Sequence, residues 1–179
     1  MFDRSIIDTA RESCGIVAGG IYHRIDNTHG EPEEHFRIEP AAWVNLTSRY
    51  GEIQAVCHSH PDGPDYPSYD DQVTQMTTAV AWGITLVRNG VAHEPFFFGD
   101  QVPIPPLKGR AFRHGVTDCF GLLRDCYRLE RGITLPNFPR REEWWESGDN
   151  LLVDLYREAG FEQVPMSCEW LPYDCALAT

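Results

Sequence analysis

Three prolines fall within residues 101–106 of the stretch QVPIPPLKGR (101–110), and this stretch divides the sequence into two parts. Proline fixes φ and has no backbone N–H, so such a run cannot continue a helix or a central strand. It is also too stiff to act as a flexible tether. We therefore expect an extended connector over 101–110, with one domain over 1–100 and a second over 111–179.

The composition is that of an ordinary globular protein, with 42% hydrophobic and 23% charged residues among 179. No run of eighteen apolar residues is present, so we expect no membrane span, and the N-terminus has no pattern of a secretory signal. A net charge of −12 without a basic block argues against a nucleic-acid partner. The six cysteines form no CxxC pair, which favours free thiols in a reducing compartment over disulfides.

Hydrophobic periodicity, together with glycine and proline positions, predicts an α/β (α+β) fold. For the first domain the expected order is α-β-β-α-β-α-β-β. The expected elements are helices over 3–12, 40–51 and 68–83, strands over 14–22, 35–39 and 52–60, and a hairpin over 83–99 that turns at Asn89-Gly90. In the second domain, residues 117–132 and 150–161 are predicted to be amphipathic helices.

The stretch HSHPDGPDYPSYDD (58–71) carries residues of the types that bind metals. His58 and His60 are two residues apart at the end of an expected strand, so they project to the same side. Asp71 follows at the start of an expected helix, after a loop that can fold back. Zinc accepts imidazole and carboxylate ligands, and a catalytic zinc site keeps a fourth position for water. The stretch therefore predicts a Zn²⁺ site formed by His58, His60 and Asp71.

A hydrolytic zinc site also needs an acid/base for the water and a donor for the developing oxyanion. Ser68, three residues before Asp71, is placed to be the donor, and Glu12 precedes the first expected strand. A solvated polar loop with incidental histidines is the alternative, and the presence of Glu12 and Ser68 argues against it. The remaining histidines of the first domain fit no such set and are expected to be surface or satisfied residues: His23, His29, His35 and His93.

These residues resemble the JAMM motif of MPN-type metalloproteases, which is a glutamate, then H-x-H, seven residues, a serine, two residues and an aspartate. Seven residues separate His60 from Ser68, and two separate Ser68 from Asp71. The resemblance covers roughly residues 1–100 and implies an MPN/JAB-like mixed sheet with flanking helices. It also implies His58, His60 and Asp71 as zinc ligands, Glu12 as the acid/base and Ser68 as the oxyanion donor.

The second domain carries the stretch TDCFGLLRDCYR, in which Cys119 begins an expected helix. A helix N-terminus favours a thiolate, and the stretch resembles the DCxGL start of NlpC/P60 cysteine peptidases. The resemblance implies the helical N-terminal part of a papain-like domain, with Cys119 as the nucleophile. The alternative is that Cys119 packs as a small hydrophobic residue. Cys126, on the same face of the helix, is expected in the core.

A cysteine nucleophile needs a histidine base, which in NlpC/P60 enzymes follows the cysteine on a later strand. After residue 100 the sequence contains one histidine, His114, and it precedes Cys119. We therefore expect this domain to be C-terminally incomplete or inactive, with His114 a poor substitute.

Both parts together resemble the protein K family of tail-assembly proteins in lambda-like siphophages. The resemblance implies other phage tail-tip proteins as partners, a peptidoglycan peptide as a substrate of the cysteine domain, and no nucleic acid. It places such a protein in the host cytoplasm during assembly, with the virion tail tip as a further location.

Two functions remain open at this point. The first is a zinc-dependent peptidase or isopeptidase, and the second is a non-enzymatic tail-tip assembly or plug protein that retains both folds for docking. A bacterial JAMM protease in sulfur-carrier chemistry is a third option, but it leaves the cysteine domain unexplained.

Overall fold

The computed structural model describes residues 8–165 and 167–176 of the chain. The chain divides into two compact units, residues 1–103 and 104–179, and the boundary lies inside the proline-rich segment. None of the helices in the described residues has the length and hydrophobicity needed to cross a lipid bilayer.

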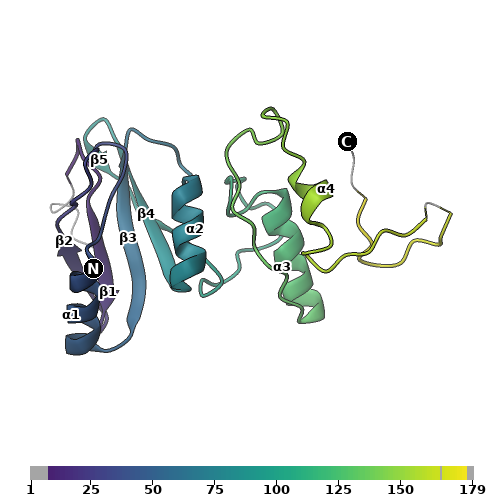
Figure 1. The fold of residues 1–179 in the computed structure, drawn as a ribbon, viewed down its shortest axis with the longest axis horizontal. Helices are drawn as coiled ribbons and strands as arrows, with labels where there is room; N and C mark the ends of the chain where they lie inside the picture. The colour runs from purple at the N-terminus through teal and green to yellow at the C-terminus, as the bar shows by residue number, and fades with distance from the viewer. Residues whose placement is uncertain (1–7, 166, 177–179) are drawn as a thin grey trace. The chain divides into compact units, whose positions relative to one another are not determined.

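The first unit is built on a mixed β-sheet (Figure 1). The strands are β1 (Cys14–Ala18), β2 (Ile21–Ile25), β3 (Ile53–Pro61), β4 (Ala81–Arg88), β5 (Val91–Ala92) and β6 (Phe96–Phe98). Their order is β2-β1-β3-β4-β5, and β6 also pairs with β4. The central β3–β4 pair is parallel, whereas the other pairs are antiparallel. The predicted mixed sheet with flanking helices is confirmed.

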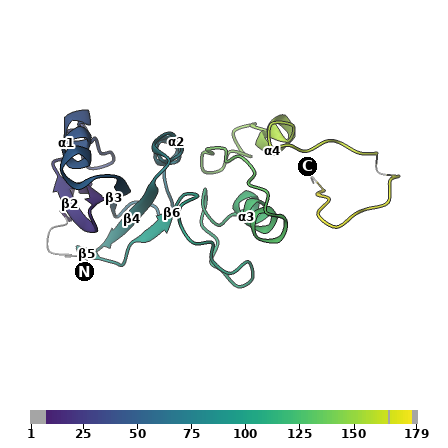
Figure 2. The ribbon, with the colours of Figure 1, turned by 90° about the horizontal axis from the view of Figure 1, so that it is seen from below.

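Helices α1 (Pro40–Tyr50) and α2 (Tyr69–Thr78) lie on the same side of this sheet (Figure 2). The core beneath α1 contains the buried residues Ile16, Ala18 and Ile53, which pack against Trp43 and Tyr50 among others. As predicted from its sequence signals, α1 begins at a proline and ends before a glycine with a positive φ.

The N-terminal part of the sheet differs from the prediction. Residues 14–22, expected as one strand, contain β1, a turn and the start of β2. Gly19 and Gly20 have φ values of 59° and 75°, a conformation that glycine adopts without steric cost and that reverses the chain. The hairpin therefore replaces the single strand.

Two other predicted elements of this region are wrong. Residues 8–12, expected as part of a helix, form bends and irregular structure, because the Asp8 carboxylate accepts hydrogen bonds from the backbone of residues 10 and 11. The rest of that helix, residues 3–7, lies outside the described residues. Residues 35–39, expected as a strand, are irregular because the side chain of Asn27 satisfies the backbone groups of His35 and Arg37.

The helix predicted over 68–83 is shorter in the structure. It ends at Thr78, Ala79 takes a left-handed conformation, and residues 81–88 form β4 instead. The apolar run around Trp82 is compatible with either a helix or a strand. It forms a strand because Trp82 and Ile84 are buried in the sheet. The observed order is therefore β-β-α-β-α-β-β-β, and the turn at Asn89-Gly90 is present as predicted.

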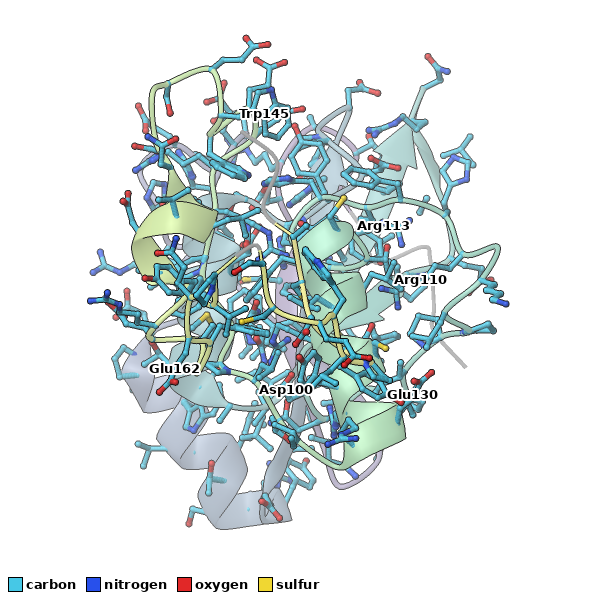
Figure 3. All side chains as sticks on the ribbon, turned by 90° about the vertical axis from the view of Figure 1, so that its right-hand side faces the viewer. Asp100, Arg110, Arg113, Glu130, Trp145 and Glu162 are labelled. Atoms are coloured by element: carbon cyan, nitrogen blue, oxygen red, sulfur yellow. The ribbon has the colours of Figure 1, made fainter. Side chains whose placement is uncertain are left out.

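The second unit contains α3 (Cys119–Arg131), the short α4 (Leu151–Leu155) and irregular segments. The helix predicted over 117–132 is confirmed, whereas the one predicted over 150–161 is shorter. Arg110 lies beside α3 (Figure 3), where its guanidinium group is 2.5 Å from the Asp125 carboxylate. The buried hydrophobic residues described in this unit are Leu135 and Ala159, so its core is small.

Candidate metal centre

The two histidines of the predicted site lie in the C-terminal half of β3, the strand between β1 and β4. His58 is opposite Cys14 of β1 and Ile84 of β4. Because side chains alternate along a strand, His58 and His60 point to the same face, which is the face that carries the helices. Both histidines are buried, with exposed fractions of 3% and 5%.

The N-terminus of α2 brings a carboxylate to the same place. Ser68 is the N-cap residue, and its hydroxyl accepts a hydrogen bond from the backbone N–H of Asp71 at 3.1 Å. In return, the Asp71 carboxylate accepts one from the backbone N–H of Ser68 at 2.8 Å. This reciprocal capping box fixes the Asp71 side chain at the start of the helix.

The three predicted ligands converge in the structure. The Nε2 atoms of His58 and His60 are 3.0 Å apart, and they lie 3.3 Å and 3.6 Å from the carboxylate oxygens of Asp71. One ligand atom from each residue falls within 4.8 Å of the others. Two imidazoles and one carboxylate are a donor set that zinc accepts, with one position left for water. The residues present therefore fit a zinc ion.

Neighbouring groups orient these ligands. The Nδ1 atom of His60 donates to the carbonyl of Pro64 at 2.9 Å, which leaves the Nε2 lone pair for a metal. His58 instead lies between aromatic rings. Phe36 stacks on it with 4.4 Å between ring centroids, and Trp82 meets it edge-on at 5.8 Å. Within the described part of the chain, the buried Nδ1 atom of His58 has no hydrogen-bond partner.

Glu12 completes the group because of strand register. Cys14 pairs with His58, so two residues earlier Glu12 lies opposite His60 at the end of the β1–β3 pair. The Glu12 carboxylate is 3.9 Å from Nε2 of His60. Burial raises the pKa of Glu12 to about 8, although His60 opposes the rise. A carboxyl group with a pKa near neutrality is suited to both accept and return a proton.

Burial and mutual contact also shift the pKa values of the three converging residues. Burial lowers the pKa of His58 more than the Asp71 carboxylate raises it. For His60 burial also lowers the pKa, but hydrogen bonds to Asp71 and to the Pro64 carbonyl raise it further, above its ordinary value. Burial raises the pKa of Asp71, yet the two imidazoles outweigh it and hold that pKa well below its usual range. The Asp71 carboxylate is thus anionic at neutral pH, as a metal ligand needs to be.

A groove of about 940 Å³ runs past these residues. The residues that line it include Glu12, His60 and Asp71, the segment 33–38 and the start of α1. Trp43 and Trp82 add apolar surface. The groove can therefore hold an extended segment beside the metal ligands.

The predicted site of the second unit is organised differently. Cys119 is the first residue of α3 and is exposed. The Asp118 carboxylate accepts from Nε and Nη2 of Arg140 at 2.6 Å and 2.7 Å, and from the backbone N–H of Gly121 at 2.9 Å. Asp118 therefore caps the helix.

The other two residues considered for this site lie elsewhere in the second unit. His114 is buried, and its Nε2 donates to the backbone carbonyl of Arg140 at 3.0 Å. Cys126 is half-buried.

Three residues around the site are not indicated by the sequence patterns: Phe36, Pro64 and Asn27. Pro64 falls among the seven residues between His60 and Ser68, and only the fold of the loop brings its carbonyl back to His60. Phe36 lies in a segment that resembles a strand, and nothing in the alternation of 35–39 indicates a contact with His58. An asparagine such as Asn27 near glycine and proline indicates a turn, but not its partners.

The chain matches one protein family and is similar to two phage proteins. Residues 7–97 match the family described as prokaryotic homologs of the JAB domain. Tail tip assembly protein K of Escherichia phage lambda is 39% identical over 130 residues, which are 73% of this chain and 60% of that protein. Tail tip assembly protein K of Escherichia phage N15 is 32% identical over 159 residues, 86% of this chain and 63% of that protein. The chain thus spans less than two thirds of the length of either relative.

A solution structure of a protein from Desulfitobacterium hafniense is also similar, with a TM-score of 0.40 and 21% identity. It covers 51% of this chain and 72% of that protein. This similarity is too distant to bear on the site.

Proposed function

The chain belongs to the family of prokaryotic homologs of the JAB domain, and on this premise we propose that its first unit is a zinc-dependent peptidase or isopeptidase that acts in phage tail-tip assembly. The observation that carries the proposal is the convergence of His58, His60 and Asp71 to within 4.8 Å, with Glu12 3.9 Å from His60. A solvated loop would not bury such a set, because buried polar groups are costly unless they are paired.

Each residue then has a chemical role. His58, His60 and Asp71 would hold a zinc ion, which when bound would supply a Lewis acid and lower the pKa of the attacking water. Glu12 takes a proton from the attacking water and later gives it to the leaving amine. The Ser68 oxygen accepts from Asp71 N–H, and its own O–H can still donate to the oxyanion that forms on the substrate carbonyl.

The groove supports a peptide substrate. Its apolar side chains, such as Phe36 and Trp43, suit the side chains of an extended segment. Two of the three proposed zinc ligands, His60 and Asp71, also line it. The tail-tip context rests on the similarity to the protein K relatives, and it implies other phage tail proteins as partners.

For the second unit we propose an NlpC/P60-like fold with Cys119 as its nucleophile and a peptidoglycan peptide as its substrate. A second candidate is a non-enzymatic docking role, which the engagement of Asp118 with Arg140 and the small core favour. Large apolar side chains of this unit are exposed: Phe112, Leu129, Trp145, Trp170 and Leu171. Such residues are suited to contact with other tail proteins.

The test of the proposed function begins with the zinc content per chain, measured by inductively coupled plasma mass spectrometry. The wild type is compared with a His58→Ala, His60→Ala double variant and with His93→Ala, a control outside the site. About one zinc in the wild type and the control, and none in the double variant, is expected. Zinc-loaded protein is then incubated with a library of internally quenched peptides. Absence of zinc from the wild type, purified without chelators, would overturn the hydrolase proposal.

A further inference from the structure

The side chain of Asn27 uses all of its hydrogen-bonding capacity between two parts of the site. Its Nδ2 donates to the carbonyl of Glu12 at 2.9 Å and to that of His35 at 2.8 Å. Its Oδ1 accepts from the backbone N–H groups of His29 and Arg37, both at 3.0 Å. A side-chain amide offers two donors and two acceptor lone pairs, and here each has a partner. The two carbonyls and two N–H groups also fix its orientation, because a flipped amide would oppose all four.

Residues 28–37 form a loop, here termed the 28–37 loop, which Asn27 closes at its base. Six of its residues line the groove beside the candidate metal ligands: His29, Glu33, Glu34, His35, Phe36 and Arg37. Phe36 also stacks on His58 at 4.4 Å. The loop therefore provides one wall of the groove and covers one of the candidate zinc ligands.

Both backbone polar groups of Glu12 are bonded within this arrangement. Its N–H donates to the carbonyl of Pro32 in the loop at 2.7 Å, and its carbonyl accepts from Asn27. The following residue, Ser13, donates its N–H to the hydroxyl of Ser59, which lies between the two histidines in sequence. The peptide that carries the Glu12 side chain is thus fixed on the loop side by Asn27 and Pro32, and on the strand side by Ser59.

We propose that Asn27 is a positioning residue that holds the Glu12 carboxyl and the 28–37 loop as one unit beside the zinc ligands. The inference rests on the proposed function, because it assigns Asn27 to the acid/base of that same site. Asn27 touches neither the ligands nor the substrate groove, so it acts through Glu12 and the loop. Small displacements of a catalytic group lower the rate steeply, and outer residues that orient a site often matter as much as its first contacts.

The test compares three variants. Asn27→Asp keeps the size and the acceptor oxygens but replaces the amide donor with a carboxylate that faces two carbonyls. Thr28→Val removes the hydroxyl bonds to Glu39 and to the Arg37 carbonyl, 2.9 Å and 3.4 Å long. It loosens the loop but keeps the two hydrogen bonds of Glu12, to Asn27 and to Pro32. Asn45→Asp makes the same charge change on the exposed face of α1. Circular dichroism checks that each variant is folded, and Asn27→Ser replaces Asn27→Asp if that variant is not.

Two readouts are independent of activity. The first is the nuclear Overhauser contact between the Glu12 side chain and the His60 ring, whose Oε1 and Nε2 atoms are 3.9 Å apart. The second is the exchange rate of the His29 and Arg37 amide protons. We expect Asn27→Asp to lose the Glu12–His60 contact and its His29 and Arg37 amide protons to exchange faster than those of the wild type. Thr28→Val should keep the Glu12–His60 contact. Asn45→Asp should match the wild type in both readouts. An unchanged Glu12–His60 contact in Asn27→Asp would overturn the inference, whether or not any peptide is cleaved.

The kinetic readout uses a peptide selected from the quenched library, at equal zinc content. Asn27→Asp is expected to lower kcat by about 10- to 100-fold. Thr28→Val is expected to raise KM with kcat within about twofold of the wild type, because it alters the groove wall alone. A purely structural role would give both variants the same pattern, and that result would also overturn the inference. If the wild type cleaves nothing, the proposed function fails while the contact measurement still decides the role of Asn27.

Discussion

The aromatic ring of Phe36 stacks on the imidazole of His58, with 4.4 Å between centroids and 24° between the ring planes. His58 is buried, and its Nδ1 has no hydrogen-bond partner in the described residues. Packing therefore holds this ring where hydrogen bonds hold most metal-binding histidines. The His60 ring is instead held by a hydrogen bond, because its Nδ1 donates to the carbonyl of Pro64.

Phe36→Ala is expected to weaken zinc binding by about tenfold, because the His58 ring loses its main packing partner and water reaches the site. The dissociation constant for zinc is measured by competition with a chromophoric chelator. Phe112→Ala is the matched control, since Phe112 is 64% exposed in the second unit. Equal zinc affinity in Phe36→Ala and in the wild type would show that the stacking has no part in holding the ligand.

Zinc is also expected to stabilise the first unit against unfolding. A ligand that binds only the folded state adds about 2.7 kcal/mol at a free concentration of 100 Kd. The thermal midpoint of the wild type should rise with added zinc and fall on dialysis against a chelator. The His58→Ala, His60→Ala variant should respond to neither. A rise of the same size in this variant would mean that zinc binds elsewhere in the chain.

The sequence predicted the candidate site better than it predicted the strands around it. The spacing of His58, His60 and Asp71 is enough to predict that their side chains converge, because a strand and a helix N-terminus fix side-chain direction locally. The contact of Glu12 with His60 depends instead on the register of β1 against β3, which spans more than forty residues of sequence. The motif identifies Glu12 by resemblance, whereas the register explains its place.

The errors in the predicted elements have causes that hydrophobic periodicity does not show. The pair Gly19-Gly20 turns a continuous apolar stretch into a hairpin. The apolar residues around Trp82 are compatible with a helix or with a buried strand, and they form a strand because they pair with β3. Hydrophobic and polar residues alternate over 35–39 as in a strand, but the backbone of this segment forms hydrogen bonds with the Asn27 side chain instead of with a neighbouring strand. The pairing of β4 with β3 is long-range, so a window of sequence does not contain it. The other two causes, a glycine turn and a side-chain contact with the backbone, are nearby in sequence but leave no trace in the hydrophobic periodicity.

Asp118 and Arg140 are expected to make the second unit sensitive to acid. The two side chains are buried and joined by two hydrogen bonds, 2.6 Å and 2.7 Å long. Burial raises the pKa of Asp118, but the Arg140 guanidinium and the N–H groups of Gly115 and Gly121 hold it below its ordinary value. The folded state therefore binds the proton less tightly than the unfolded state. The stabilisation is complete above the unfolded pKa of about 4 and is lost as the pH falls toward the folded pKa.

Asp118→Asn should remove this pH dependence and should lower the free energy of unfolding at pH 7 by about 3 kcal/mol, because Arg140 keeps a buried charge without its partner. Urea unfolding is followed through the amide cross-peak of Gly121, whose N–H donates to Asp118, at neutral pH and at about pH 3. Glu33→Gln breaks only an exposed contact with Arg11, 3.8 Å long, and should change stability by less than about 0.5 kcal/mol. If wild type and Asp118→Asn lost equal stability on acidification, another carboxyl group would carry the effect.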